Sequence, residues 1–257
     1  MKLALIWLGA WISLSLISSA FFYLPDHVLE ATLRAPGQWP PFGSDAFGRA
    51  LHWLVPASAW VSMLFAASAS LVALTLASAL GSVFAVVPMR IRFVFERVLD
   101  FLLAFPPLLF ALFWAAVNGP GWGTLSVALL VGAVPAHVRL VYSRGRELLK
   151  EDYLLAAVAS GASLPRLVGR YLFPEMLRTA AVKLPNVFAH ALIAEATLTY
   201  MGVGAPMGRD TWGSLLVQGK DYLLEAPYIA LWSGLPLVFT LLAVMALVPE
   251  KGYHRAR

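Results

Sequence analysis

Residues 55–87 read VPASAWVSMLFAASASLVALTLASALGSVFAVV, without a single charged side chain or histidine. A helix needs about 20 apolar residues to cross the hydrocarbon core of a bilayer, so this run predicts a membrane-spanning helix. The run is longer than one span requires, which indicates either a tilted helix or a first turn that lies in the membrane interface. This stretch decides the fold class, because it predicts an integral membrane protein rather than a soluble domain.

The composition of the whole chain supports the same class. Of its 257 residues 60% are hydrophobic and 13% are charged, whereas a soluble domain carries about 25% charged residues. The chain contains no cysteine, which excludes disulfides, thiolate metal sites and a cysteine nucleophile. The net charge of +5 is not gathered on one face or tail, so membrane orientation explains it better than nucleic-acid binding.

Five further apolar runs accompany the first, and together they predict about six transmembrane helices in a single all-α domain over residues 1–257. The N-terminal run, residues 3–24, is expected to be retained as a helix rather than cleaved as a signal peptide, since it is long enough to span the membrane. Prolines 106 and 107 break one run, which neighbouring helices can tolerate within a bilayer. The runs are 3–24, 99–117, 124–141, 179–203 and 226–248.

The distribution of Lys and Arg between the runs predicts the orientation. Fifteen of the 19 basic residues fall in segments on one side of the predicted membrane, and four on the other. Because cytoplasmic loops carry the excess of Lys and Arg, both termini and the loop of about 143–178 are expected in the cytoplasm. The loops of about 25–54 and 204–225 are expected outside.

The predicted cytoplasmic loop contains signals for two short helices. Asp152 is a good N-cap for a first helix, and Gly161 can end it in the left-handed conformation. Ser163 can cap a second helix with Pro165 in its first turn, and Pro174 is expected to end or kink it. The pattern predicts two helices joined by a glycine hinge. An ordinary amphipathic connection between two spans is the alternative.

The spacing within this loop resembles the "EAA" loop through which ABC importer permeases contact their ATPases. That motif runs Glu-Ala-Ala, three residues, Gly, nine residues, Ile-x-Leu-Pro. Here the glycine, the small residues and the proline are in place, while Leu155, Tyr171 and Phe173 replace Glu, Ile and Leu. The resemblance implies that the loop couples to an ATPase through Asp152, Leu155, Ala156, Ala157, Gly161, Ala162, Ser163, Tyr171, Phe173 and Pro174.

Further segments resemble the dipeptide/oligopeptide/nickel permease family, and the chain is most similar to the second of its two permease subunits. Residues 43–49 (GSDAFGR) are similar to the family's Gly-Thr-Asp-x-x-Gly-Arg segment. Residues 194–204 (AEATLTYMGVG) and 211–216 (TWGSLL) match its later motifs, so the likeness covers about residues 40–248. The C-terminal tail departs from the family pattern.

This resemblance implies a type I importer permease in the inner membrane of a bacterium. The expected partners are a second homologous permease, two ABC ATPases that bind ATP and magnesium, an external solute-binding protein and the lipid bilayer, but no nucleic acid. This chain is expected to bind no cofactor and to be no enzyme itself. Short peptides are the first expectation for the substrate, with nickel or another small solute as the alternative. Contacts to the binding protein are expected at Ser44, Asp45, Arg49 and Trp212.

A self-sufficient channel and a membrane-embedded enzyme are the alternatives from other classes. Glu195 is the one acidic residue well inside an apolar run, so it is expected either to line the substrate route or to have a structural role. His137 and His190 also lie in apolar runs, but neither has a second ligand at helical spacing, so no metal site is predicted. An enzyme would have to combine them with Asp100, which is expected at the opposite side of the membrane from Glu195.

Overall fold

The computed structural model describes residues 2–21, 32–37, 41–204 and 210–248. Within these ranges the chain forms helices and one isolated β-bridge, between Ser44 and Ala50. The helices are α1 (Lys2–Phe21), α2 (Leu51–Val86), α3 (Met89–Ala104), α4 (Pro107–Asn118), α5 (Trp122–Leu148), α6 (Asp152–Ala159), α7 (Leu164–Arg166), a π-helical turn (Leu167–Leu172), α8 (Phe173–Ala181), α9 (Leu184–Tyr200), α10 (Trp212–Asp221) and α11 (Pro227–Met245). The predicted tail of 249–257 and parts of both predicted external loops lie outside the described residues.

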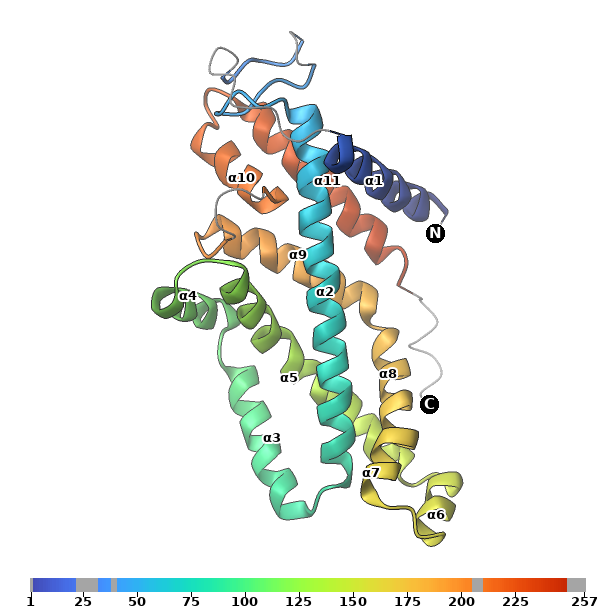
Figure 1. Cartoon of the computed structure of the whole chain (residues 1–257). Coiled ribbons are helices and arrows are strands. Elements are labelled where there is room, and N and C mark those ends of the chain that lie inside the picture. Colours follow the sequence, from blue (N-terminus) through green and yellow to red (C-terminus); the bar gives the residue numbers. More distant parts are fainter. Residues whose placement is uncertain (1, 22–31, 38–40, 205–209, 249–257) are drawn as a thin grey trace.

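Helix α2 is the central element and runs along most of the length of the molecule (Figure 1). It crosses α5 closely, because a Cβ added to Gly81 would lie 2.6 Å from Cγ2 of Val141 and one added to Gly145 would lie 3.0 Å from Cβ of Ala85. Small residues at such crossings allow helix backbones to approach in a membrane, where helix association depends on packing. The tight crossing therefore fixes α5 against α2.

The third apolar run is broken into two helices at its prolines, as its sequence suggested, and the break is a sharp bend. Helices α3 and α4 meet at an angle of 86° around Pro106 and Pro107. Two consecutive prolines remove the N–H groups that would have bonded the carbonyls four residues earlier, and their rings crowd the preceding turn. The bend is too sharp for a kink within one straight helix, so the run becomes two helices of different direction.

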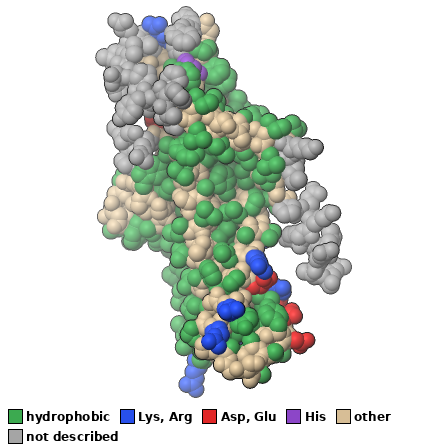
Figure 2. Space-filling view, turned by 45° about the vertical axis from the view of Figure 1, so that its right-hand side comes forward, with side chains coloured by type: hydrophobic (Ala, Val, Ile, Leu, Met, Phe, Trp, Pro, Cys, Tyr) green, Lys and Arg blue, Asp and Glu red, His purple; other side chains and the backbone are tan. Residues whose placement is uncertain are grey.

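The other predicted runs coincide with α1, α2, α5, α9 and α11. Among the described residues α2, α5 and α11 are long and apolar enough to cross a membrane alone, and α3 with α4 makes a fourth candidate if the bent pair counts as one. Helix α9 has 17 residues, and the apolar part of α1 covers Leu3–Ser18. Hydrophobic side chains cover the middle of the visible surface, and charged side chains gather near the end that holds α6 (Figure 2).

Candidate functional site

Helix α6 forms the tip of the molecule at the end opposite α10 (Figure 1). Its N-cap is Glu151, so the prediction that Asp152 caps it was wrong by one residue. Asp152 is instead the first helical residue, and its negative charge still interacts favourably with the positive end of the helix dipole. The helix itself lies where the run of helix formers predicted it.

The end of α6 confirms the predicted glycine hinge. Gly161 has a φ of +80°, a left-handed conformation that glycine adopts without strain. The N–H of Gly161 bonds the carbonyl of Val158 at 2.9 Å, and the N–H of Ala162 bonds that of Ala157 at 3.0 Å. This pair of bonds is a Schellman motif, which satisfies the last carbonyls of the helix and turns the chain sharply.

The second helix of the loop is longer than the sequence indicated. Ser163 occupies the predicted N-cap position of α7, although its side chain makes no capping hydrogen bond. The chain then continues through the π-helical turn into α8, so Pro174 does not end the helix but sits in the first turn of α8. The N–H of Phe173 bonds the carbonyl of Val168, five residues back. The wider π turn accommodates a proline that an ordinary helix interior would not tolerate.

The tip exposes an apolar surface that none of the described residues covers, which we call the α6 surface. Its members are exposed by 51–61% and are Tyr153, Leu155, Val158 and Leu164. Next to them Ala156 is exposed and Ala157 is half-buried, so small side chains flank the larger ones. Exposed apolar patches mark sites where a protein binds another protein or a membrane. Tyr171 and Phe173, by contrast, are half-buried and belong to the scaffold behind the tip.

One buried side chain anchors the α6 surface to the rest of the molecule. Leu154 is 1% exposed and packs in a hydrophobic core together with Leu148, Leu167, Leu172 and Met176. The same core continues through Val138 of α5 to Val187 of α9. A force applied to α6 therefore acts on α5 and α9 through close-packed side chains, which transmit strain because they have little free volume.

A buried ion-pair cluster lies at the opposite end of the molecule, and we call it the Arg49 triad: Asp45, Arg49 and Asp210. Arg49 Nη2 lies 2.7 Å from Oδ2 of Asp45, and its Nη1 lies 2.5 Å from Oδ2 of Asp210. The carboxylate of Asp45 also accepts the backbone N–H of Phe47 at 2.9 Å and of Arg49 at 2.7 Å. The triad thus ties the loop before α2 to the segment before α10.

The charge of Arg49 is stabilised despite its position. Burial opposes the charge, but the hydrogen bonds and charges of Asp210 and Asp45 outweigh that effect and raise the guanidinium pKa above its ordinary value. Asp45 is fully buried, and only 12% of the Arg49 side chain is exposed. The pair consequently behaves as a buried salt bridge, whose members depend on each other.

Three of the four residues predicted to contact the binding protein are not on the surface. Ser44, Asp45 and Trp212 are each 0% exposed and bond within the chain. The Ser44 hydroxyl accepts the N–H of Arg34 at 2.9 Å, and the Trp212 indole donates to the carbonyl of Val55 at 3.1 Å. Their side chains hold the segments before α2 and at the start of α10, so a direct contact stays a prediction for Arg49 alone.

Glu195 lies in a buried polar network between three helices. Its carboxylate accepts hydrogen bonds from Ser62 of α2 at 3.3 Å and from Thr199 of α9 at 3.1 Å. The Ser62 hydroxyl in turn accepts the backbone N–H of Trp212 at the start of α10 at 3.0 Å. The network joins α2, α9 and α10. This position favours the structural alternative for Glu195, because the residue does not line the cavity between α2, α4, α5 and α9.

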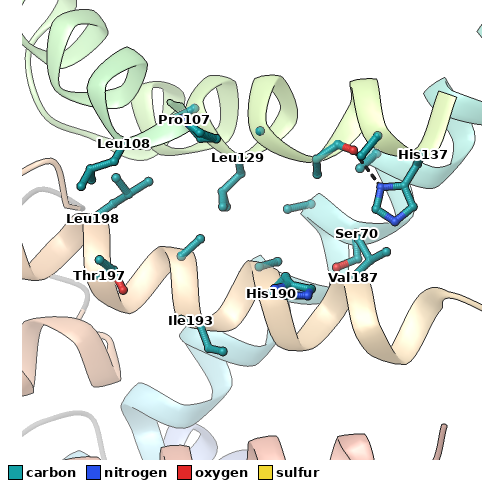
Figure 3. A pocket seen from close by; sticks show the side chains of 18 residues that line it. Ser70, Pro107, Leu108, Leu129, His137, Val187, His190, Ile193, Thr197 and Leu198 are labelled. Atoms are coloured by element: carbon teal, nitrogen blue, oxygen red, sulfur yellow. Dashed lines mark hydrogen bonds between the residues drawn. The ribbon is translucent and has the colours of Figure 1, made fainter. Parts of the chain in front are cut away.

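That cavity has a volume of about 600 Å³ and lies between α2, α4, α5 and α9. Figure 3 shows His137 and His190 on its walls, from α5 and α9 respectively. Both histidines lie in apolar runs of the sequence. Their spacing along the chain could not indicate a shared cavity, because they come from different helices. Asp100 pairs with Arg97 and Arg139, whereas Glu195 bonds Ser62 and Thr199, so the two acids have different partners.

Most of the chain matches a known protein family. Residues 73–249 match the family described as binding-protein-dependent transport system inner membrane component. The chain belongs to this family. The match begins inside α2 and includes the α6 surface, Glu195 and the α4, α5 and α9 walls of the cavity, while Ser62 and residues 43–50 precede it. The permease is thus a membrane component of a transport system, which disfavours the enzyme and channel alternatives.

Individual relatives resemble the permease over most of its length. A peptide transport system permease protein of Brucella suis is 35% identical over 216 residues, which are 81% of this chain and 70% of that relative. The di/tripeptide transport system permease protein DppC of Pseudomonas aeruginosa is 29% identical over 229 residues, or 86% and 76%. The dipeptide transport system permease protein DppC of Escherichia coli K12 is 32% identical over 147 residues, or 57% and 49%.

Proposed function

We propose that the permease forms half of the translocation pathway of an ABC importer for short peptides. A second homologous permease forms the other half, two ABC ATPases bind ATP and magnesium, and an external solute-binding protein delivers the substrate. The names of the relatives support peptides over nickel, since each is named for peptide transport. The chain itself binds no nucleotide in this proposal, and its energy comes from the ATPases.

The α6 surface is the observation that carries the coupling role. It is apolar, it stands at the end of the molecule, and Leu154 fixes it to the core that reaches α9. When ATP closes the two ATPases, a docked α6 moves with them as a rigid body and shifts α5 and α9 between two packings. Leu155, where the family pattern has Glu, makes this contact an apolar one. ATP drives the change because the closed ATPases bind one arrangement of the permeases better than the other.

Co-expression with its partners tests this function. The permease, carrying an affinity tag, is expected to retain both an ABC ATPase and a second permease during purification. The reconstituted complex, with its binding protein, is expected to take up trialanine only when ATP is present on the ATPase side. A permease that purifies without any ATPase, or ATP-independent uptake, would contradict the proposal.

The same proposal places α6 in the cytoplasm and the Arg49 triad outside, as the distribution of basic residues predicts. Single cysteines at Leu164 and Leu224 test it, since these side chains are 61% and 98% exposed and the chain has no cysteine of its own. In intact cells a membrane-impermeant maleimide is expected to label position 224 and to spare position 164 until the membrane is opened. The reverse pattern would show an inverted orientation.

A further inference from the structure

The cavity between α2, α4, α5 and α9 is suited in size to a small ligand. Its volume of about 600 Å³ lies within the range of roughly 300–1,000 Å³ that is typical of small-molecule sites. Eight of its 18 lining residues are alanine or glycine, namely Ala69, Ala73, Ala128, Gly132, Ala133, Ala136, Ala191 and Ala194. In a membrane domain such small residues normally permit helices to pack closely. Here they leave an open space.

His137 gives the cavity a directed polar group. Its Nδ1 lies 2.7 Å from the backbone carbonyl of Ala133, and because a carbonyl can only accept, Nδ1 must carry the proton (Figure 3). In the neutral ring Nε2 is then left as an acceptor. His190 and Thr197 line the cavity from α9, across from His137. Ionisable side chains in membrane helices typically face a substrate pathway rather than lipid.

Pro107 lies in the cavity wall at the first position of α4, and a Cβ on Gly132 would sit 3.3 Å from its Cβ. The polar side chains of the lining are few: Ser70, His137, His190 and Thr197. The hydroxyl of Ser70 already donates to the carbonyl of Ala66 within α2. The acceptor on His137 is therefore suited to a ligand that brings an N–H donor.

We propose that this cavity is a binding site for the transported peptide within the membrane domain, and that Nε2 of His137 accepts an N–H of the peptide. A short peptide fits this chemistry because its amino group and backbone amides are donors, while its varied side chains meet an apolar wall of small residues. The inference rests on the proposed function, since it names the place where a substrate of that importer binds. We expect the site to discriminate weakly between peptides of different sequence. One acceptor on an apolar wall binds the peptide backbone and does not recognise its side chains.

The first experiment measures access to the cavity. Ala194→Cys, in the assembled importer with labelling followed on this chain, is expected to react with a positively charged methanethiosulfonate during ATP turnover. Excess trialanine, delivered by the binding protein, is expected to slow that reaction. Ala116→Cys is the control, because Ala116 is exposed on α4 and does not line the cavity, so trialanine should not protect it. Reaction with a lipid-soluble maleimide only would show a lipid-filled groove and overturn the proposal.

The second experiment tests the acceptor. His137→Phe is expected to lower the maximal rate of trialanine uptake about three- to tenfold, the effect of one lost hydrogen bond. His137→Gln keeps an acceptor oxygen and is expected to recover part of that rate. Both variants should assemble as the wild type does, which co-purification of the partner subunits measures. Unchanged uptake by His137→Phe would overturn the role of His137.

The two proposals fail in distinguishable ways. If the wild-type importer does not transport trialanine at all, the peptide assignment fails. The reaction of Ala194→Cys with the charged reagent still decides whether the cavity is open to a polar solute. If wild-type uptake is normal and trialanine protects neither Ala194→Cys nor the control, the proposed function stands and the cavity is not the substrate site.

Discussion

Gly161→Leu is expected to abolish ATP-driven uptake while the permease still inserts and pairs in the membrane. Gly161 has a φ of +80°, and a residue with a Cβ adopts the left-handed conformation at a cost of about 1–2 kcal/mol. Apart from its two chain neighbours, none of the residues that the structure describes lies within 4 Å of the added Cβ, so the leucine meets no obstacle among them. The substitution therefore strains the Schellman turn that orients α6. The larger side chain also obstructs the ATPase that docks on α6. Co-purification of the ATPase and uptake of trialanine measure both effects.

Gly169→Leu is the matched control for this prediction. Gly169 lies in the π-helical turn, is exposed, has no positive φ, and an added Cβ there also meets nothing within 4 Å. The same substitution away from the hinge is expected to retain ATPase association. Gly161→Asn should also recover part of the activity, since asparagine tolerates the left-handed region better than other residues. Full transport by Gly161→Leu would mean that this loop does not couple the permease to its ATPase.

Arg49→Met is expected to destabilise the permease by about 3–5 kcal/mol, the usual cost of removing one member of a buried ion pair. The reason is Asp45, which is 0% exposed and would keep its negative charge without a cation. Asp210, at 19% exposure, would lose the same partner and release the segment before α10. Thermal unfolding of the purified complex in detergent, followed by loss of the folded permease, measures the change.

Arg97→Met provides the comparison, because Arg97 pairs with Asp100 at the surface and 67% of its side chain is exposed. Exposed pairs contribute about 0–1 kcal/mol, so this variant should unfold close to wild type. The double variant Asp45→Asn/Arg49→Met is expected to be more stable than Arg49→Met, since it removes the unpaired charge. If Arg49→Met and Arg97→Met lower the unfolding temperature equally, Asp45 and Arg49 do not form a buried pair in the assembled permease.

Local chemistry was sufficient to predict the elements that depend on neighbouring residues. Gly161, Ser163 and Pro165 each act on the backbone within a few residues, and the hinge and the start of the second helix lie where they indicated. Hydropathy likewise located the spans, because the cost of placing charge in a bilayer applies to every residue in turn. The single error in capping, at Asp152, is the usual uncertainty of one residue at a helix end.

Features that depend on distant residues could not be predicted in this way. Asp210 reaches Arg49 only after α9 and α10 have folded back onto the start of α2, and its loop position gave no sign of that contact. The 86° bend at Pro106 depends on how α4 packs against α5, while the prolines by themselves indicate only a break. His137 and His190 share a cavity because helix packing, rather than spacing in the chain, brings α5 and α9 together.

The length of α2 has a consequence for how this chain can vary. Its 36 residues extend for about 54 Å, against about 30 Å for the hydrocarbon core. One end follows the Arg49 triad directly and the other end packs in the core that holds Leu154. Inserting or deleting one residue within α2 would turn everything beyond it by about 100° and move it by about 1.5 Å. A loop can accommodate such a change by altering its conformation, but a continuous helix cannot. The contacts at both ends of α2 therefore fix its length, and insertions or deletions in the chain are expected only outside this helix.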